Sequence, residues 1–548
     1  MNQRFVTRFL TPVFLMLAMF ATACGSSGSD SAADTGSAEE SSAESAESAE
    51  SSESATESTE PAGDGRFVYA APSPIFDIDP NSSFSTEGIA LHNVYDTLTR
   101  FNPPGSADLV SPNLATDWTS NDDLSEWTFT LRDDVTFHDG TKMTAESVRG
   151  SLQRTIDLGL GAAFIFGSIE SMDVVDDTTI TFNLGFPAPL DLVMSSAFGA
   201  YIMSADATTQ ETDWFNAGND GGTGPYMITS HLPNESTTLA RYDDYWGGWS
   251  DKSIDEVEIQ IVEDSVLAEQ LLRSGDADFS YNLSSDSIPS LEGEDGLAVV
   301  RGTSMTNLTG LLNHVTLSPE AREALILSFP YDDITAGLYG GEANRAQGVI
   351  PQAVWGSSTL DLPDTDLDAA AKILADAGET GLTVTYSFDA GDTQQQQIGE
   401  VWKASLATID VDLQLEPLTF DARWEIQQGD PAEAFDVFAL FWFPTYVTPY
   451  DYMFSMFRSE EFPFFNLGYH ANADFDALID EGDFLTATDR AAAEANFAAA
   501  NQMLIDTNAA VFMLDVPDVN VINSAIDGYV SNPGYSNVVR FNELTENG

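Results

Sequence analysis

The chain has 548 residues, of which 88 are Asp or Glu and 20 are Lys or Arg, so its formal net charge is −68. This charge excludes nucleic acid as a partner, because too few cations are present to neutralise phosphates. The single cysteine, Cys24, excludes a scaffold of internal disulfides.

The N-terminus carries the features of an export signal. Arg4 and Arg8 precede the apolar run Phe9–Phe20, and small residues then lead to Cys24. This pattern predicts a signal peptide over residues 1–23. The apolar run is shorter than the roughly 20 residues that a helix needs to span a bilayer. Residues 25–65 are mainly Ser, Ala, Glu, Gly and Thr, a composition that favours a disordered tether.

Short alternating strands are expected in the first half of the remaining chain. Apolar and polar residues alternate over Trp127–Leu131 and again over Val257–Ile261, which is typical of half-buried strands. Further along, Ser318-Pro319-Glu320 predicts a helix start with a cap, a first-turn proline and a first-turn acid. Leu367–Ala377 predicts a helix that Gly378 closes.

The second half predicts an α/β lobe. Strands are expected over 382–388, 411–415 and 435–443, separated by helices around 398–409 and 420–428. Strand and helix in alternation favour a parallel sheet. A long alanine-rich helix is expected over 489–506, followed by strands over 510–514 and 519–522, which return the chain to an earlier sheet.

Two family resemblances rest on these residues. Cys24, after Ala21-Thr22-Ala23, resembles the lipobox of bacterial lipoproteins, which implies cleavage before Cys24 and acylation of its thiol. The alternative is an ordinary secreted protein with a stray cysteine. Leu131–Gly140, followed by Thr144–Val148, resembles the signature of bacterial extracellular solute-binding proteins of family five. Matches in the same order continue over the chain from Phe67 to Val530, at Asn93–Leu98, Pro112–Trp118, Gly222–Tyr226, Arg241–Gly247, Gly275–Asp278 and Asn472–Ile479.

The second resemblance implies an α/β, two-lobed fold like that of periplasmic binding proteins, with a hinge and an additional small subdomain on the first lobe. The implied boundaries are residues 66–93, 224–303 and 515–548 for lobe 1, 94–223 for the subdomain and 304–514 for lobe 2. It also implies a monomer that hands its ligand to an ABC permease and ATPase. The expected location is outside the cytoplasm, anchored to the cell membrane by lipid, in the periplasm or on the outer face of the cytoplasmic membrane.

Candidate site residues follow the expected strand over 435–443. Ligands bind outside the carboxyl ends of parallel strands, so we expect Trp442, Phe443, Thr445 and Tyr446 to contact the ligand. The alternative is that these aromatic residues are lobe core. Ser83 and Phe84 resemble a stretch that relatives place against the ligand, and a surface loop is the alternative there.

The ligand is expected to be an oligopeptide or a dipeptide-like molecule. Peptide-binding relatives usually carry an acidic residue where this chain has Thr445, and Asp451 is the candidate substitute. Without that charge a buried ammonium group is costly, so a sugar, a metal complex or another small solute is the alternative. We expect no catalytic residue, cofactor or metal. The glycine-rich stretch near Gly222 lacks the phosphate-loop lysine, Asp77–Ser82 lacks the calcium-loop glycine, and the five histidines have no metal-ligand spacing. An extracellular hydrolase is the rival class.

Overall fold

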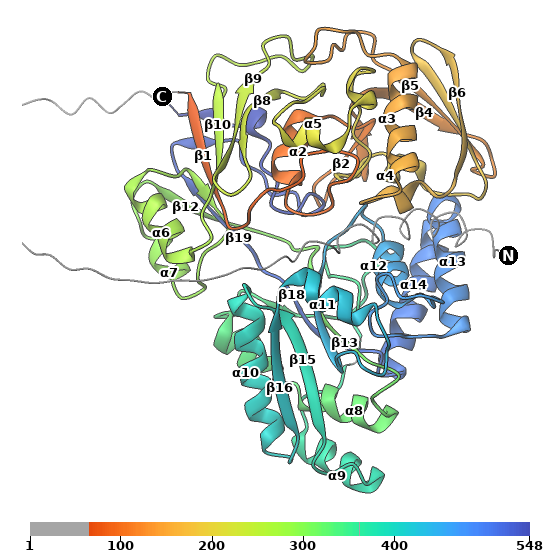
Figure 1. Ribbon diagram of the computed structural model, residues 1–548, viewed down its shortest axis with the longest axis vertical. Coiled ribbons are helices and arrows are strands. Elements are labelled where there is room, and N and C mark those ends of the chain that lie inside the picture. Colours follow the sequence, from red (N-terminus) through yellow and green to blue (C-terminus); the bar gives the residue numbers. More distant parts are fainter. Residues whose placement is uncertain (1–64, 361, 548) are drawn as a thin grey trace, which may run out of the picture. The chain divides into compact units, whose positions relative to one another are not determined.

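Three larger sheets organise the part of the chain that the computed structural model describes, residues 65–360 and 362–547. Cys24, the expected signal peptide and the tether up to Asp64 lie outside these residues. The strands of each sheet come from separate stretches of the chain, and Figure 1 shows how they are arranged.

Lobe 1 is built on a sheet of seven strands. In spatial order they are β12 (Leu297–Gly302), β19 (Asp518–Asn523), β11 (Phe279–Ser280), β1 (Arg66–Ala71), β10 (Glu256–Ile261), β9 (Ser236–Arg241) and β8 (Tyr226–Leu232). The central strand β1 runs parallel to β10 and β11, and it is buried along almost its whole length. Separate hydrophobic clusters cover the two faces of this sheet.

Shorter elements complete lobe 1 and its surroundings. The helices are α2 (Gly88–Val94), α4 (Leu190–Val193), α5 (Thr212–Asn216), α6 (Ser265–Ser274) and α7 (Ile288–Leu291). Two small hairpins pair β2 (Thr99–Phe101) with β3 (Val110–Pro112) and β20 (Ile526–Asp527) with β21 (Thr545–Glu546).

A small antiparallel sheet forms a subdomain. Its strands, in order, are β4 (Ala115–Ser120), β5 (Glu126–Leu131), β7 (Thr179–Leu184) and β6 (Ile169–Asp176). Alternate residues of β5 are buried, as the sequence predicts. Helix α3 (Ala145–Leu158) contacts β6 and β7. It begins at Thr144, whose hydroxyl accepts a hydrogen bond from the backbone of Ser147, and this cap satisfies an N–H that the first turn leaves unpaired.

Lobe 2 is built on a mixed sheet of six strands. They are, in order, β14 (Asn344–Arg345), β18 (Ala510–Asp515), β13 (Asn307–Leu312), β17 (Val437–Trp442), β15 (Thr383–Asp389) and β16 (Asp412–Leu418). β15 runs parallel to β16 and β17, as predicted, but β13 is antiparallel to β17 and β18. The parallel arrangement predicted for β15, β16 and β17 is therefore confirmed, but the sheet as a whole is mixed. The reason is that β13 enters from lobe 1 and β18 returns to it.

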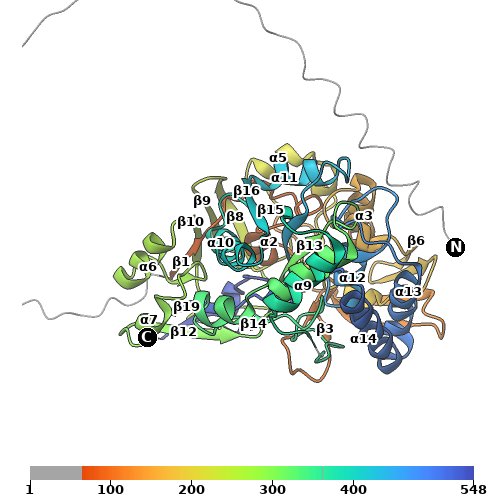
Figure 2. The same cartoon turned by 90° about the horizontal axis from the view of Figure 1, so that it is seen from below.

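Most helices of lobe 2 were predicted, but those over Pro449–Phe457 and Ala473–Thr488 were not. The helices are α8 (Pro319–Ser328), α9 (Leu367–Ala377), α10 (Thr393–Ala407), α11 (Phe420–Gln427), α12 (Pro449–Phe457), α13 (Ala473–Thr488) and α14 (Arg490–Asp506). Ser318 caps α8, and Gly378 ends α9 with a left-handed φ of 76°, both as predicted. Helix α10 ends before Ile409, which was expected inside it. In both Figure 1 and Figure 2, α13 and α14 lie side by side.

The two lobes are joined by a pair of short crossovers. The chain leaves β12 at Gly302 to begin β13 at Asn307, and it returns from β18 to β19 through Val516 and Pro517. The backbone N–H of Val516 donates to Thr306 O (2.9 Å), so the two crossovers are hydrogen-bonded to each other. β19 then pairs with β11 and β12, which confirms the predicted return to an earlier sheet.

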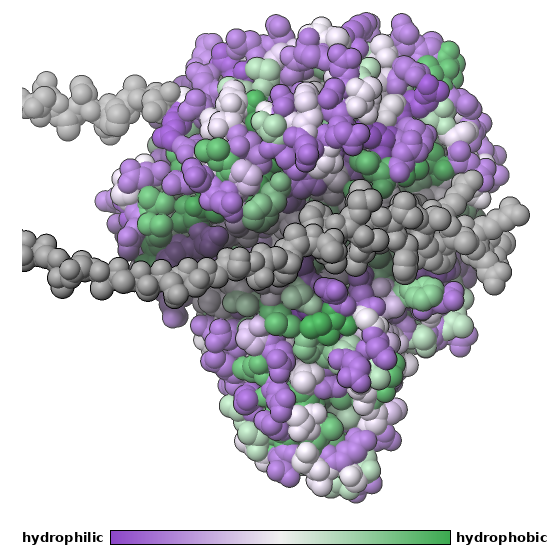
Figure 3. Space-filling model, viewed as in Figure 1, coloured by the Kyte–Doolittle hydropathy of each residue, from purple (hydrophilic) through white to green (hydrophobic). Residues whose placement is uncertain are grey.

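A continuous hydrophobic core connects the subdomain with the helical side of lobe 2. It contains Phe129 and Phe182 of the subdomain sheet together with Tyr452 of α12 and Phe497 of α14. Much of the visible face of lobe 1 is hydrophilic, in keeping with the large negative charge, and hydrophobic residues are more frequent on lobe 2 (Figure 3). Within residues 65–360 and 362–547, none of the helices combines the length and the apolar character needed to span a bilayer.

Candidate ligand-binding site between the lobes

The loop after β17 joins lobe 2 to the segment that follows α4. Residues 443–448 leave the carboxyl end of β17, and Thr448 then caps α12 by accepting a hydrogen bond from Tyr450 N. The hydroxyl of Ser196, in the segment after α4, donates to Thr445 O at 2.6 Å. This hydrogen bond joins residues that are 249 positions apart, one in the segment after α4 and the other in lobe 2.

Asp451, in the first turn of α12, is the charged group beside this loop. Its Oδ2 accepts hydrogen bonds from the Trp442 indole N–H and from Thr445 N, both at 3.0 Å. Its Oδ1 has no hydrogen-bond partner among the described residues, and neither has the hydroxyl of Thr445. Burial raises the pKa of Asp451 to about 7, and hydrogen bonding with Trp442 and Thr445 opposes that rise. A carboxylate that is 2% exposed, with one free oxygen, is expected to need a cationic or donor partner.

Aromatic rings from both sides meet beside this carboxylate. We call Phe84, Phe164, Phe198, Phe443 and Phe465 the interlobe aromatic cluster. Phe84 contacts each of the other four, with ring centroids 5.2 to 6.4 Å apart. Phe198 also packs on Phe443 at 5.6 Å. All of these rings except Phe198 remain partly exposed, so the cluster presents apolar surface within the cleft.

The structure places the candidate residues in two groups. Trp442, Thr445 and Asp451 are hydrogen-bonded together, and Phe84 and Phe443 meet in the aromatic cluster. Trp442 and Tyr446 are only 6% and 8% exposed and belong to the large core, so both also stabilise the lobe. Ser83 is buried behind Phe84, and among the described residues no hydrogen bond joins it to the loop.

Sequence reasoning missed Phe164, Phe198, Phe465 and Ser196. Phe164 lies in a 3-10 helix, η2 (Ala163–Phe166), and the others lie outside helices and strands. Such positions carry no period of two or 3.6, so hydrophobic patterning could not assign them a direction. The usable signal was the high phenylalanine content of 34 residues, but it does not say which rings meet.

The lobe 1 side of the cleft is fixed by a buried ion pair. Both carboxylate oxygens of Asp79 accept from the Arg154 guanidinium, at 2.6 and 2.7 Å, and Thr212 adds a further hydrogen bond. Asp79 is fully buried. Because Ser83 N also donates to Asp79 O, this pair holds the turn that carries Phe84 onto α3.

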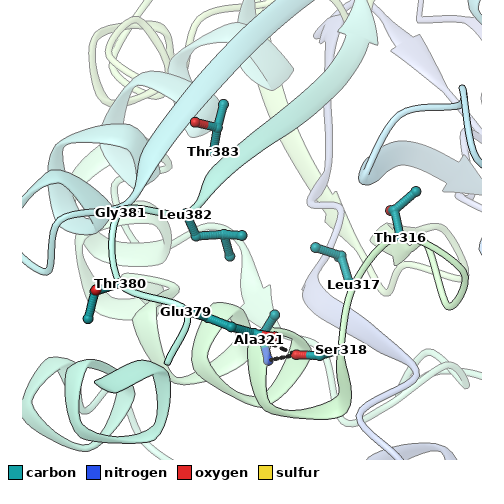
Figure 4. Close-up of a pocket in the computed structure, with 9 residues that line it drawn as sticks. All are labelled: Thr316, Leu317, Ser318, Ala321, Glu379, Thr380, Gly381, Leu382 and Thr383. Atoms are coloured by element: carbon teal, nitrogen blue, oxygen red, sulfur yellow. Dashed lines mark hydrogen bonds between the residues drawn. The ribbon is translucent and has the colours of Figure 1, made fainter. Parts of the chain in front are cut away.

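Two other features do not belong to the candidate site. His138, within the signature motif, is buried and hydrogen-bonded to Asp220 and to Gly224 O, which ties this motif to the glycine-rich loop. A surface pocket of about 310 Å³ lies between the start of α8 and the loop before β15 (Figure 4). Ser318 caps α8 and bonds Glu379 there. Since it adjoins the amino end of β15, this pocket lies at the opposite edge of the sheet from residues 443–448.

Comparisons with known proteins agree with this architecture. Residues 110–464 match the model of the bacterial extracellular solute-binding proteins, family 5 middle region. The probable D,D-dipeptide-binding periplasmic protein DdpA of Escherichia coli (strain K12) is 27% identical over 456 residues, which cover 81% of this chain and 86% of that protein.

Solved structures show the same fold. The periplasmic binding protein DppA from Helicobacter pylori, in complex with the peptide STSA, superposes with a TM-score of 0.77 at 22% identity. The match covers 88% of this chain and 98% of that one. NikA from Staphylococcus aureus, in complex with Ni(L-His)2, gives 0.74 at 17% identity, with 88% and 100% covered. The predicted α/β, two-lobed fold is thus confirmed, and the chain belongs to the bacterial extracellular solute-binding proteins of family 5.

Proposed function

We propose that this protein is the extracytoplasmic substrate-binding component of an ABC importer and that it captures a short peptide between its lobes. The observation that carries the proposal is the free Oδ1 of buried Asp451, at the loop where the lobes meet. An ammonium group is a cation with three donors, so a peptide N-terminus supplies both the charge and the hydrogen bonds that this oxygen lacks. The relatives named for dipeptides and peptides support this choice of ligand.

We assign the domain boundaries by the three larger sheets. Lobe 1 comprises residues 66–93, 224–303 and 515–548, the subdomain 94–223 and lobe 2 304–514. The crossovers around Thr306 and Val516 act as the hinge, and closure forms the hydrogen bond between Ser196 and Thr445. Moving a hinge from mostly open to mostly closed takes about 5.5 kcal/mol of differential affinity. Micromolar binding corresponds to about 8 kcal/mol, so a small ligand is sufficient.

We further propose a membrane anchor, a tether and partner subunits for this protein. Cys24 carries a lipid anchor after removal of residues 1–23, and residues 24–65 are a tether. The protein acts as a monomer, delivers its ligand to a membrane permease with its ATPases, and leaves the bonds of the ligand unchanged. Labelling of the expressed protein with a radioactive fatty acid, compared between the native chain and Cys24→Ser, tests the anchor.

Isothermal titration calorimetry with Ala-Ala-Ala and with N-acetyl-Ala-Ala-Ala tests the ligand. We expect the free peptide to bind and acetylation to weaken binding by roughly a hundredfold, since a buried charge loses its partner. Equal binding of both peptides contradicts the role of Asp451. If neither peptide binds and native mass spectrometry of the purified protein shows a sugar or a metal complex, the peptide proposal fails.

A further inference from the structure

The aromatic cluster and the free carboxylate are neighbours, and their connection specifies more about the ligand. Trp442 links them directly, because its indole N–H donates to Asp451 while its ring packs against Phe465 with centroids 5.0 Å apart. A second link runs from Asp451 through Thr445 to Ser196. Ser196 in turn accepts a hydrogen bond from the backbone N–H of Phe198, a member of the cluster.

The cluster is apolar throughout. Its five rings come from five separate segments of the chain and contact one another across the cleft. A charged side chain placed among these rings would lose its hydration without gaining an ion-pair partner from them. An aromatic side chain would gain apolar burial together with edge-to-face contacts.

We propose that the site selects peptides whose first residue carries a large apolar side chain, with aromatic residues preferred. This proposal rests on the proposed function, in which Asp451 binds the peptide ammonium group. The first side chain branches from the carbon that carries this ammonium group, so it must enter the space next to the carboxylate. Trp442, which packs on Phe465, and Ser196, which bonds Phe198, place the aromatic cluster close to that carboxylate.

The partial exposure of four of the rings supports this assignment. Phe84, Phe164, Phe443 and Phe465 keep exposed surface although the two sides of the cleft are in contact. Trp442 and Tyr446, in contrast, are in the core and have little surface left to offer a ligand. The specificity of the first position is therefore assigned to Phe84 and Phe443, one from each side.

A peptide series tests the proposal. The tripeptides Phe-Ala-Ala, Leu-Ala-Ala, Ala-Ala-Ala and Glu-Ala-Ala differ only in the first side chain. Burial of a phenyl or isobutyl group predicts that the Phe and Leu peptides bind at least tenfold more tightly than the Ala peptide. The Glu peptide is expected to bind most weakly. Equal affinities across the series would overturn the proposed selectivity and leave the peptide function standing. Failure of all four peptides to bind would overturn both.

Two variants assign the preference to the cluster. Phe443→Ala and Phe84→Ala are each expected to reduce the ratio of the affinities for Phe-Ala-Ala and Ala-Ala-Ala to about threefold or less. Phe76→Ala and Phe484→Ala are matched controls, because these phenylalanines are 60% and 44% exposed and lie outside the cluster. Phe443→Leu, which keeps an apolar side chain, should retain most of the preference. If Phe443→Ala fails to fold, Phe84→Ala tests the assignment. An unchanged preference in both cluster variants contradicts the assignment.

Discussion

Two buried aspartates lie on opposite sides of the cleft, and they differ in how fully their charge is satisfied. Asp79, on the lobe 1 side, receives two hydrogen bonds from Arg154 and one from Thr212. Asp451, on the lobe 2 side, receives two hydrogen bonds on one oxygen and none on the other, and no ion pair is found for it among the described residues. Burial alone does not distinguish a structural carboxylate from a candidate binding one, and Asp483 and Asp515 also keep one unpaired oxygen among the described residues. Asp451 differs from these two because it is hydrogen-bonded to Thr445, which in turn accepts a hydrogen bond from Ser196.

The largest expected effect concerns the ion pair between Asp79 and Arg154. Arg154→Ala leaves Asp79 buried without its cation and should lower the free energy of unfolding by about 3–5 kcal/mol. Chemical denaturation measures this change. Arg149→Ala on the same helix removes an exposed ion pair with Glu146 and should hardly alter stability. Equal effects of the two variants would contradict the structural role of Asp79.

Substitution of Asp451 should weaken ligand binding and hardly change stability. Asp451→Asn is expected to weaken binding of a free-ammonium peptide by roughly 2–5 kcal/mol, because the ammonium group loses its counter-charge. The melting temperature of the ligand-free protein should hardly change, since a neutral amide is easier to bury. Asp483→Asn is the matched comparison: Asp483 is also buried, with a pKa of about 7, but it lies on α13, where its charge acts on Tyr446 and Tyr450, and no hydrogen bond joins it to Trp442 or Thr445 among the described residues. A similar loss of affinity in both variants would show that Asp451 has no special role.

The raised pKa of Asp451 predicts how affinity depends on pH. Between its ordinary pKa of roughly 4 and its folded value of about 7, the ligand-free protein holds a proton that the unfolded chain releases, so its contribution to stability falls as pH rises. A bound ammonium group requires the ionised form. Affinity should therefore fall about tenfold for each pH unit below 7.

Calorimetry between pH 5 and 7, in buffers with different ionisation enthalpies, detects the proton released on binding. Asp483 and Asp515 also have pKa values near 7, so the relevant quantity is the difference between the native protein and Asp451→Asn. A slope that survives in Asp451→Asn would assign the titration to another group.

The smallest expected effect is that of one hydrogen bond. Trp442→Phe keeps most of the buried ring but removes the indole N–H from Asp451, which should weaken peptide binding by about 1–2 kcal/mol. It should also shift the pH profile upward, because that hydrogen bond holds the pKa of Asp451 down. Trp442→Ala would instead empty a core position at a cost of about 3–5 kcal/mol, and its effect on binding would be mixed with that on folding. A profile that stays in place in Trp442→Phe would contradict this coupling.

The sequence predicted the parts of the fold that local patterns determine. Alternation located β5, β10, β15 and β16, and the cap and stop residues Ser318 and Gly378 located the ends of α8 and α9. The antiparallel direction of β13 could not be predicted. It depends on how the chain crosses between the lobes, and no short-range pattern encodes that path.

The same limit applies to the site. Trp442, Thr445 and Asp451 were named as candidates because they lie at the end of a predicted strand or shortly after it, within a run of ten residues. Phe164, Phe198 and Phe465 come from elsewhere in the chain, and only the folded structure shows that they meet Phe84.

A crystal structure of the protein bound to Phe-Ala-Ala tests the central claim most directly. We expect the peptide nitrogen within hydrogen-bond distance of Asp451 Oδ1 and the phenyl ring against Phe84 and Phe443. A peptide bound outside the cleft, or one whose terminal nitrogen is held by another group, would contradict the account.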